Sequence, residues 1–325
     1  MWWIRRFPAT TSGAVLLCIL VLWFAAMGAL SPEELPHYAQ SRREVIGMAL
    51  MLILLPPYLV AVSIVTRRLS LRLVDELEPL SRRPQDCDRA RRAIQNGWKR
   101  ALLPGALLGV VLGLANTSSI DAFTTTVAAH VHIALMSGQM LLWLLIGLLL
   151  AIRFVASRGF RRLGEVLDFE LFRLDQLKPL ARSGLLDMVM IAGALALSPL
   201  QALDAEFRWY NYQYGLFVAV FASGLLVIWP LLPIHRRIRA EKARQLAHVE
   251  RLLADEGSAS TTAELSRLET LLAHRDRLKN LRPWLFSTDL VSRFLLYLIS
   301  PPLAWVGAAI VERFVDRILT GGVAG

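Results

Sequence analysis

Charged residues are scarce in this chain of 325 residues, in which Asp, Glu, Lys and Arg together account for 19%. Soluble domains carry about 25%. The stretches 13–30, 45–65 and 216–234 contain no charged residue at all. Uncharged runs of about 18 residues or more are long enough to cross a bilayer as helices. This scarcity therefore excludes a soluble globular protein.

Cysteine is also scarce: Cys18 lies in an apolar run and Cys87 in a basic stretch. Two cysteines so placed exclude a secreted scaffold held together by disulfides. The sequence contains no Walker A loop, GxGxxG, HExxH or GxSxG motif, and its six histidines are scattered. We therefore predict no enzymatic activity, no cofactor and no bound metal.

What the sequence does contain is a series of apolar segments, with mean hydropathy +0.47 over the chain. Hydropathy predicts seven membrane spans. They lie at 13–30, 45–65, 101–116, 132–152, 184–203, 213–234 and 288–311. The predicted fold class is all-α, a polytopic bundle of seven transmembrane helices that forms a single membrane domain over residues 1–325.

The positive charges follow the same segmentation. Of the 36 Lys and Arg residues, 30 lie in the N-terminus and in the 66–100, 153–183 and 235–287 loops, which alternate along the chain. The positive-inside rule places these segments in the cytoplasm and the C-terminus in the periplasm. The net charge of +10 then faces anionic headgroups of the bilayer, which explains it without a nucleic acid partner.

The first apolar run has a second interpretation. Arg5 and Arg6 precede it and small residues follow it, as in a cleavable signal peptide. The run is long for such a peptide, so we interpret it as a retained span.

The longest charged loop predicts a cytoplasmic helical hairpin at 235–285. Its first helix ends near Gly257, and Thr261 with Glu264 forms a capping box for the second helix, which Pro283 ends. Each helix has an apolar stripe. The two stripes either bury each other or form a coiled coil that docks a second copy or a cytoplasmic protein.

Two other charged segments are amphipathic. The 66–100 loop predicts two short helices at the membrane interface, and the 160–181 stretch has apolar residues at helical spacing, which predicts a helix lying on the membrane surface. A further short amphipathic helix is expected at 311–319.

Three strings in the C-terminal half, at 169–185, 234–246 and 282–311, carry a resemblance. They resemble a layout found in uncharacterised bacterial multi-pass membrane proteins. In it, a basic helical insert follows one span, and the last span is interrupted by prolines. The resemblance implies a location in the bacterial inner membrane and implies no activity.

Ionisable residues inside spans are the main functional candidates, because burying charge in a bilayer is costly. Asp187 and Arg293 each lie about one helical turn into a span from the cytoplasmic side, so we predict that they pair across the bundle. Asp289 is a local competitor for Arg293, and snorkelling to the headgroups is the structural alternative.

A second candidate is a stripe of small residues in the third span. Gly105, Gly109 and Gly113 repeat every four residues, which predicts close contact with another helix. The spacing leaves open whether that helix belongs to the same chain or to a second copy.

These observations favour a non-enzymatic assembly or scaffold protein that acts through its basic cytoplasmic helical face, with a second copy or a cytoplasmic protein as partner. The alternative is a channel or transporter whose path runs among helices interrupted by proline. No span has an acidic residue near its middle, which argues against a carrier coupled to protons or sodium.

Overall fold

The computed structural model describes residues 9–31, 39–81, 83–124, 128–197, 200, 210–255, 262–281, 292 and 296. The long helices are α2 (Ala9–Ala26), α3 (Ala39–Leu77), α4 (Pro84–Thr124), α5 (Ala129–Val166), α6 (Lys178–Leu197), α7 (Tyr210–Ser223), α8 (Leu232–Asp255) and α9 (Thr262–Asn280). Shorter turns are η1 (Glu78–Leu80), η2 (Leu171–Leu177), η4 (Gly224–Ile228) and η5 (Trp229–Leu231). The described chain is all-helical, apart from one isolated bridge between Ser81 and Leu167.

Six helical segments among the described residues are long and apolar enough to cross a membrane. They contain or overlap the first six predicted spans, so the all-α, multi-pass membrane character is confirmed. The segments are Ala9–Ala26, Val45–Leu80, Pro84–Asn116, Ala129–Val166, Leu171–Leu197 and Gly215–Ala254. Of the predicted seventh span at 288–311 only residues 292 and 296 are described, and the helix at 311–319 and Arg293 lie outside the described residues.

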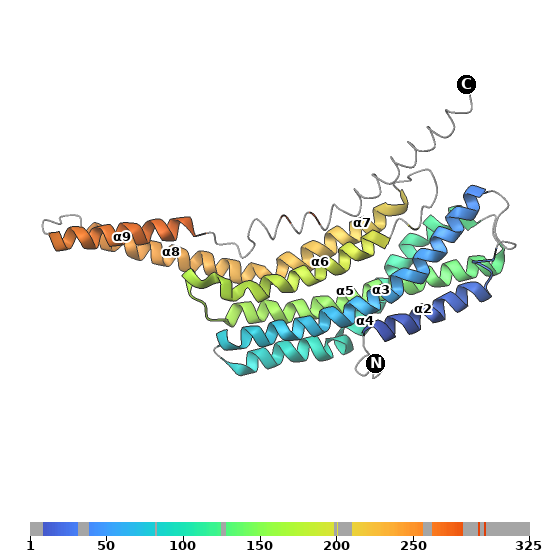
Figure 1. Cartoon of the computed structure of the whole chain (residues 1–325), viewed down its shortest axis with the longest axis horizontal. Helices are drawn as coiled ribbons and strands as arrows, with labels where there is room; N and C mark the ends of the chain where they lie inside the picture. Colours follow the sequence, from blue (N-terminus) through green and yellow to red (C-terminus); the bar gives the residue numbers. More distant parts are fainter. Residues whose placement is uncertain are drawn as a thin grey trace, which may run out of the picture.

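Three of these helices are much longer than a bilayer is thick. Helix α3 has 39 residues, α4 has 41 and α5 has 38. At a rise of about 1.5 Å per residue each is roughly 57 to 62 Å long, against about 30 Å for the hydrocarbon core. They run side by side along the long axis of the molecule (Figure 1). The two helices predicted at 66–100 are present and the second continues into the third predicted span, but neither is short and separate, because the first is the end of α3 at Leu77 and the second is the start of α4 at Pro84.

We call the end of the molecule that holds the α3–α4 and α5–α6 connections the basic end. It lies on the left in Figure 1, on the side toward which α8 extends. Backbone contacts join the two connections, since Asp168 N–H donates to Leu80 O at 2.8 Å. Arg237 on α8 donates to Leu167 O at 2.9 Å and to Gly164 O at 3.1 Å, so α8 is fixed to the C-terminus of α5.

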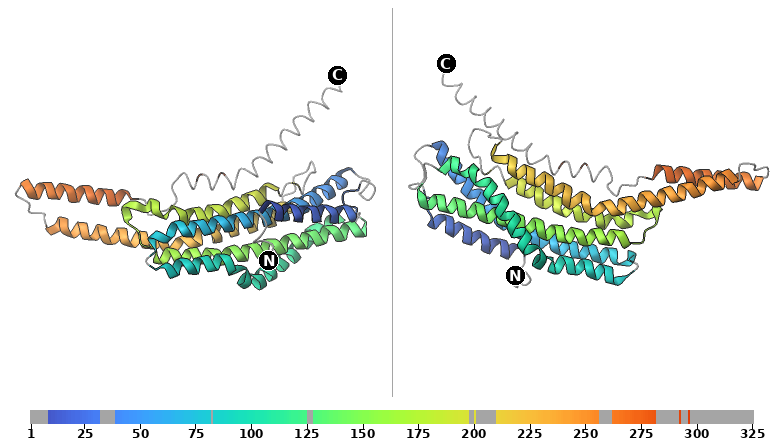
Figure 2. Two further views of the ribbon diagram at one scale, coloured as in Figure 1. Left: turned by 60° about the horizontal axis from the view of Figure 1, so that its bottom comes forward. Right: turned by 180° about the vertical axis from the view of Figure 1, so that it is seen from behind.

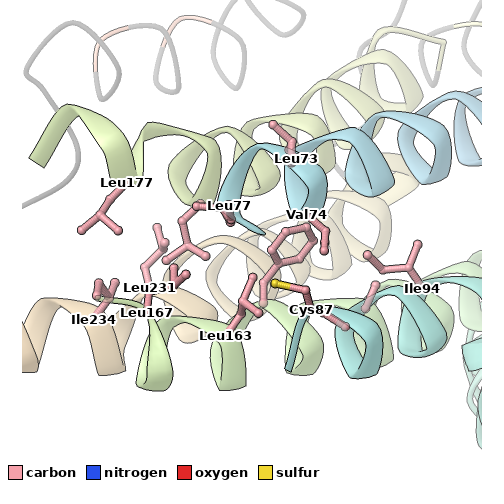
Figure 3. Packing of buried hydrophobic residues seen from close by; sticks show 14 of the residues in the cluster. Leu73, Val74, Leu77, Cys87, Ile94, Leu163, Leu167, Leu177, Leu231 and Ile234 are labelled. Atoms are coloured by element: carbon pink, nitrogen blue, oxygen red, sulfur yellow. The ribbon is translucent and has the colours of Figure 1, made fainter. Parts of the chain in front are cut away.

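The basic end has a hydrophobic core of its own (Figure 3). Its buried members come from α3, α4, α5, η2, α6, η5 and α8. They are Leu73, Val74, Leu77, Cys87, Ala90, Ile94, Ala156, Phe160, Leu163, Leu167, Leu171, Leu177, Leu180, Leu231, Ile234 and Ile238. The prediction that 160–181 lies on the membrane surface is wrong, because its apolar stripe is covered by other helices of the chain.

A second cluster fills the opposite part of the bundle, where α2, α3 and α5 meet. Phe24 and Leu52 are fully buried in it. Gly138 on α5 leaves the space that the Phe24 ring occupies, since a Cβ there would lie 2.8 Å from Phe24 Cζ. This cluster lies within the apolar parts of the helices, so it forms the core of the membrane-spanning bundle.

Helices α7 and α8 form one nearly continuous rod through η4 and η5. The π-helical turn η4 ends two residues before Pro230, which lacks the N–H that a regular α-helix would use there. Beyond the basic end, α8 and α9 lie side by side (Figure 2). Lys242 Nζ on α8 donates to Lys279 O at 2.8 Å and Leu281 O at 2.7 Å, which caps the end of α9.

Candidate functional site

Most of the buried polar side chains of the described chain lie in one layer between the two hydrophobic clusters. Each of three helices contributes a pair spaced four residues apart, so both members lie on the same helix face. The pairs are Thr66 and Ser70 on α3, Arg153 and Ser157 on α5, and Ser183 and Asp187 on α6. All six residues are at most 4% exposed. We call these six residues the polar layer.

An ion pair forms the centre of the polar layer. Arg153 Nε donates to Asp187 Oδ1, and the two side chains are only 5% and 4% exposed. A second nitrogen of the same guanidinium, Nη1, donates to Ser70 Oγ at 3.2 Å. The arginine thereby connects α3, α5 and α6 at one level of the bundle.

The hydroxyl groups of the other members of the polar layer either donate hydrogen bonds to a nearby backbone carbonyl of the same helix or have no hydrogen-bond partner among the described residues. Thr66 Oγ1 donates to Ser63 O at 3.1 Å, and Ser183 Oγ donates to Leu180 O at 2.7 Å. Ser157 Oγ is buried without a hydrogen-bond partner among the described residues. Because removing one member of a buried ion pair leaves an uncompensated charge, Arg153 and Asp187 depend on each other.

The rod formed by α7, η4, η5 and α8 approaches the polar layer closely at η4, where it meets a glycine of α6. A Cβ at Gly184 on α6 would lie 3.1 Å from Val227 Cγ1 in η4. Next to Arg153, the ring of Phe154 stacks on Trp229 at 5.1 Å between centroids. The ion pair is therefore enclosed by protein on the side of η4 and η5.

The partner of Asp187 in the structure is not the residue that the sequence predicted. The carboxylate is engaged by Arg153, whereas Arg293 lies outside the described residues, so a pair between Asp187 and Arg293 stays a prediction. Sequence reasoning missed Arg153 because the hydropathy boundary of the fourth span falls at residue 152, which assigned Arg153 to a loop. Its spacing of four from Ser157, on a helix that continues to Val166, was the available signal.

The predicted glycine stripe faces α5 of the same chain at all three positions, and at two of them it meets the α5 backbone. A Cβ at Gly105 would lie 2.8 Å from Leu148 Cα, and one at Gly109 would lie 2.6 Å from Leu144 Cα. Gly147 on α5 is the closest counterpart, since its Cβ would lie 2.3 Å from Gly109 N. A Cβ at Gly113 would meet side chains instead: it would lie 2.8 Å from Sδ of the flexible Met140 and 3.5 Å from Trp143 Cβ.

A small cavity of about 120 Å³ lies deeper in the bundle between α3, α5, α6 and α7. Its lining is mostly apolar. Two buried polar atoms belong to residues that line it, Gln139 Oε1 and Trp143 Nε1, and neither has a hydrogen-bond partner among the described residues. Unsatisfied polar atoms of this kind are uncommon in buried positions.

A larger hollow of about 920 Å³ lies at the basic end, between α8, α9 and the 168–172 segment. Charges of both signs line it, including Glu170, Glu241 and Arg244. Phe172 is 51% exposed, and its ring lies 5.5 Å from the ring of His274 on α9. We call this hollow the arm groove, and α8 with α9 the arm.

The chemistry available in these places is electrostatic and hydrophobic. Among the described residues no group of three or more His, Cys, Asp or Glu side chains is placed to hold a metal ion. Comparison with protein-family models, with curated proteins and with solved structures finds no match to this chain. The function is therefore argued from the geometry.

Proposed function

We propose that the protein is an inner-membrane scaffold with seven spans, whose basic end faces the cytoplasm and assembles with a second copy or with a cytoplasmic protein. The observation that carries the proposal is the separate hydrophobic core of the basic end. Helices that only needed to cross the bilayer would not have to extend beyond it and bury a second set of leucines. A folded body outside the membrane provides a rigid base for a docking surface.

The orientation follows from charge. The 66–100, 153–183 and 235–287 segments carry 28 of the 36 Lys and Arg residues, and such segments are retained in the cytoplasm. The N-terminus is then cytoplasmic, and the seventh span at 288–311 brings the C-terminus to the periplasm.

The arm and the arm groove are the surfaces that we assign to assembly. Helix α8 has 24 residues, or about 36 Å of helix, and we assign it together with α9 to the cytoplasmic hairpin predicted at 235–285. Exposed aromatic residues in a hollow are typical of anchoring positions at protein interfaces. Phe172 has this position.

The test shortens the arm and keeps its base. Deleting residues 246–274 and joining the ends with a short Gly-Ser linker leaves Arg237 and Lys242 in their contacts. Light scattering on the protein in detergent then compares oligomer size, and crosslinking in cells compares partners. We expect the shortened protein to lose its assembly.

A point variant gives a matched control. Phe172→Ala in the arm groove is expected to weaken the assembly, whereas Phe217→Ala on α7, which is 72% exposed, removes a ring of the same size from the apolar bundle. Unchanged oligomer size and unchanged crosslinks in both the shortened protein and Phe172→Ala would refute the scaffold.

A second candidate function is a channel or transporter. The observation that favours it is the pair of unsatisfied atoms, Gln139 Oε1 and Trp143 Nε1, beside an intramembrane cavity next to a π-helical turn, since such turns are frequent at functional sites. Flux assays in reconstituted vesicles test it. Wild-type flux that changes in Gln139→Leu would favour this function over the scaffold.

A further inference from the structure

Arginines line the surface between α4 and α5 at the basic end. A groove of about 630 Å³ is lined by Arg89, Arg100, Arg158 and Arg162. A second hollow of about 430 Å³ shares three of them and adds Arg92. We call the two hollows together the arginine groove.

The positive charge of this groove is only partly neutralised. Two carboxylates line it. Asp86 pairs at 3.2 Å with Arg89, which also lines the groove, and Glu165 lies 3.7 Å from Arg161, which does not. The remaining four arginines, Arg92, Arg100, Arg158 and Arg162, form no ion pair with the described residues. Three of these four line each hollow, and Arg100 and Arg162 line both. Like charges gathered in this way repel each other unless an anion lies between them.

The groove also has an apolar end. Pro104 and Ala151 line it, and Arg100 is the last charged residue before the uncharged stretch of α4. Beyond this point α4 presents an exposed apolar face, with Leu103 70% and Leu107 59% exposed. The surface thus changes from cationic to apolar along one helix at the level where a bilayer changes from headgroup to hydrocarbon.

We propose that the arginine groove binds one anionic glycerophospholipid. Its phosphate is held by Arg100 and Arg162, and its acyl chains lie along the exposed face of α4. Guanidinium groups bind phosphate oxygens through two parallel hydrogen bonds. A free phosphate would leave the apolar end of the groove unused, and a lipid with no net charge would leave the arginines uncompensated.

The site follows from local geometry and does not depend on the scaffold role. Anionic lipids are abundant in the cytoplasmic leaflet, so the site agrees with the orientation proposed for the basic end. A bound lipid would fill the space between α4 and α5 below their glycine contact and hold the two long helices together.

The experiment measures lipid binding to the full-length protein in detergent by native mass spectrometry. Phosphatidylglycerol and phosphatidylcholine with identical acyl chains are titrated separately. We expect phosphatidylglycerol to bind at least about tenfold more tightly, because the choline cation of phosphatidylcholine neutralises its own phosphate and is repelled by the arginines. The double variant Arg100→Gln/Arg162→Gln should lose about the same factor for phosphatidylglycerol alone.

Two variants serve as controls. Arg239→Gln/Arg251→Gln on α8 makes the same change in net charge outside the groove and should bind like the wild type. Arg100→Lys/Arg162→Lys keeps the charge and should retain part of the affinity. Thermal unfolding of each variant shows that the bundle is intact.

Competition identifies the source of the phosphate. Millimolar inorganic phosphate should leave phosphatidylglycerol bound, because it lacks the acyl chains. Complete displacement by inorganic phosphate, equal binding of the two lipids to the wild type, or wild-type affinity in the double Gln variant would each overturn the proposal. Displacement by inorganic phosphate and the comparison of the two lipids are both measured on the wild-type protein, so a failure of the double variant to fold leaves the proposal testable.

Discussion

The guanidinium of Arg153 on α5 binds the carboxylate of Asp187 on α6, and both are buried where the intramembrane core meets the core of the basic end. The two residues are 34 positions apart in the sequence. Their pairing fixes the register of α5 against α6. It also lies between the two hydrophobic clusters of the long bundle.

This relationship predicts a non-additive pair of mutations. Arg153→Leu or Asp187→Leu alone should lower the free energy of unfolding by about 3–5 kcal/mol, because each leaves one buried charge without a partner. The double variant should recover most of that loss, since no charge is left. Unfolding in mixed detergent micelles measures all three.

Arg68→Leu is the control for the cycle, because Arg68 is exposed on α3 and its loss should change stability little. Additive losses in the double variant would show that the two residues stabilise the protein independently.

The contact between α4 and α5 predicts a graded response to added methyl groups. Gly109→Ala should destabilise the protein by about 1–3 kcal/mol, because its Cβ meets backbone that cannot move aside without shifting a helix. Gly113→Ala should cost less, since Met140 can change rotamer. Thermal midpoints in detergent give the order.

Gly215→Ala on α7 serves as the reference, because a Cβ there meets nothing within 4 Å. Equal midpoints for Gly109→Ala and Gly215→Ala would contradict the close contact between α4 and α5.

The bond from Arg237 to the end of α5 predicts a local effect. Arg237→Gln should destabilise the basic end by about 1–2 kcal/mol, because the carbonyls of Gly164 and Leu167 lose their donor. Hydrogen exchange should increase first at 160–167. The neighbouring Arg236→Gln removes an exposed charge and should leave exchange unchanged, so equal effects of both variants would refute the capping role.

The proposed orientation predicts the accessibility of α9. In a variant with Cys18 and Cys87 replaced by Ala, Ser266→Cys carries the only thiol, at an exposed position of α9. A membrane-impermeant maleimide should label it only after the inner membrane is permeabilised. Labelling in intact spheroplasts would place the arm in the periplasm and reverse the topology.

The sequence by itself determined the helical, membrane-spanning character and the six described crossing segments. It could do so because a bilayer requires every backbone polar group to be bonded within its own helix, so a long uncharged run has one stable conformation. The glycine spacing on α4 indicated a helix contact for a similar reason, since a Cβ-free stripe is visible without knowing its partner.

Only the tertiary structure decided which surface covers each amphipathic segment. The leucines at 160–181 would bury the same apolar area against lipid or against protein. An apolar stripe therefore predicts that an apolar surface covers it, but not which surface that is. The segment lies in a protein core because α3, α4 and α8 pack beside it. In the same way, the sequence identified Asp187 as a charge that needs a partner. The register of α5 against α6 decided that this partner is Arg153.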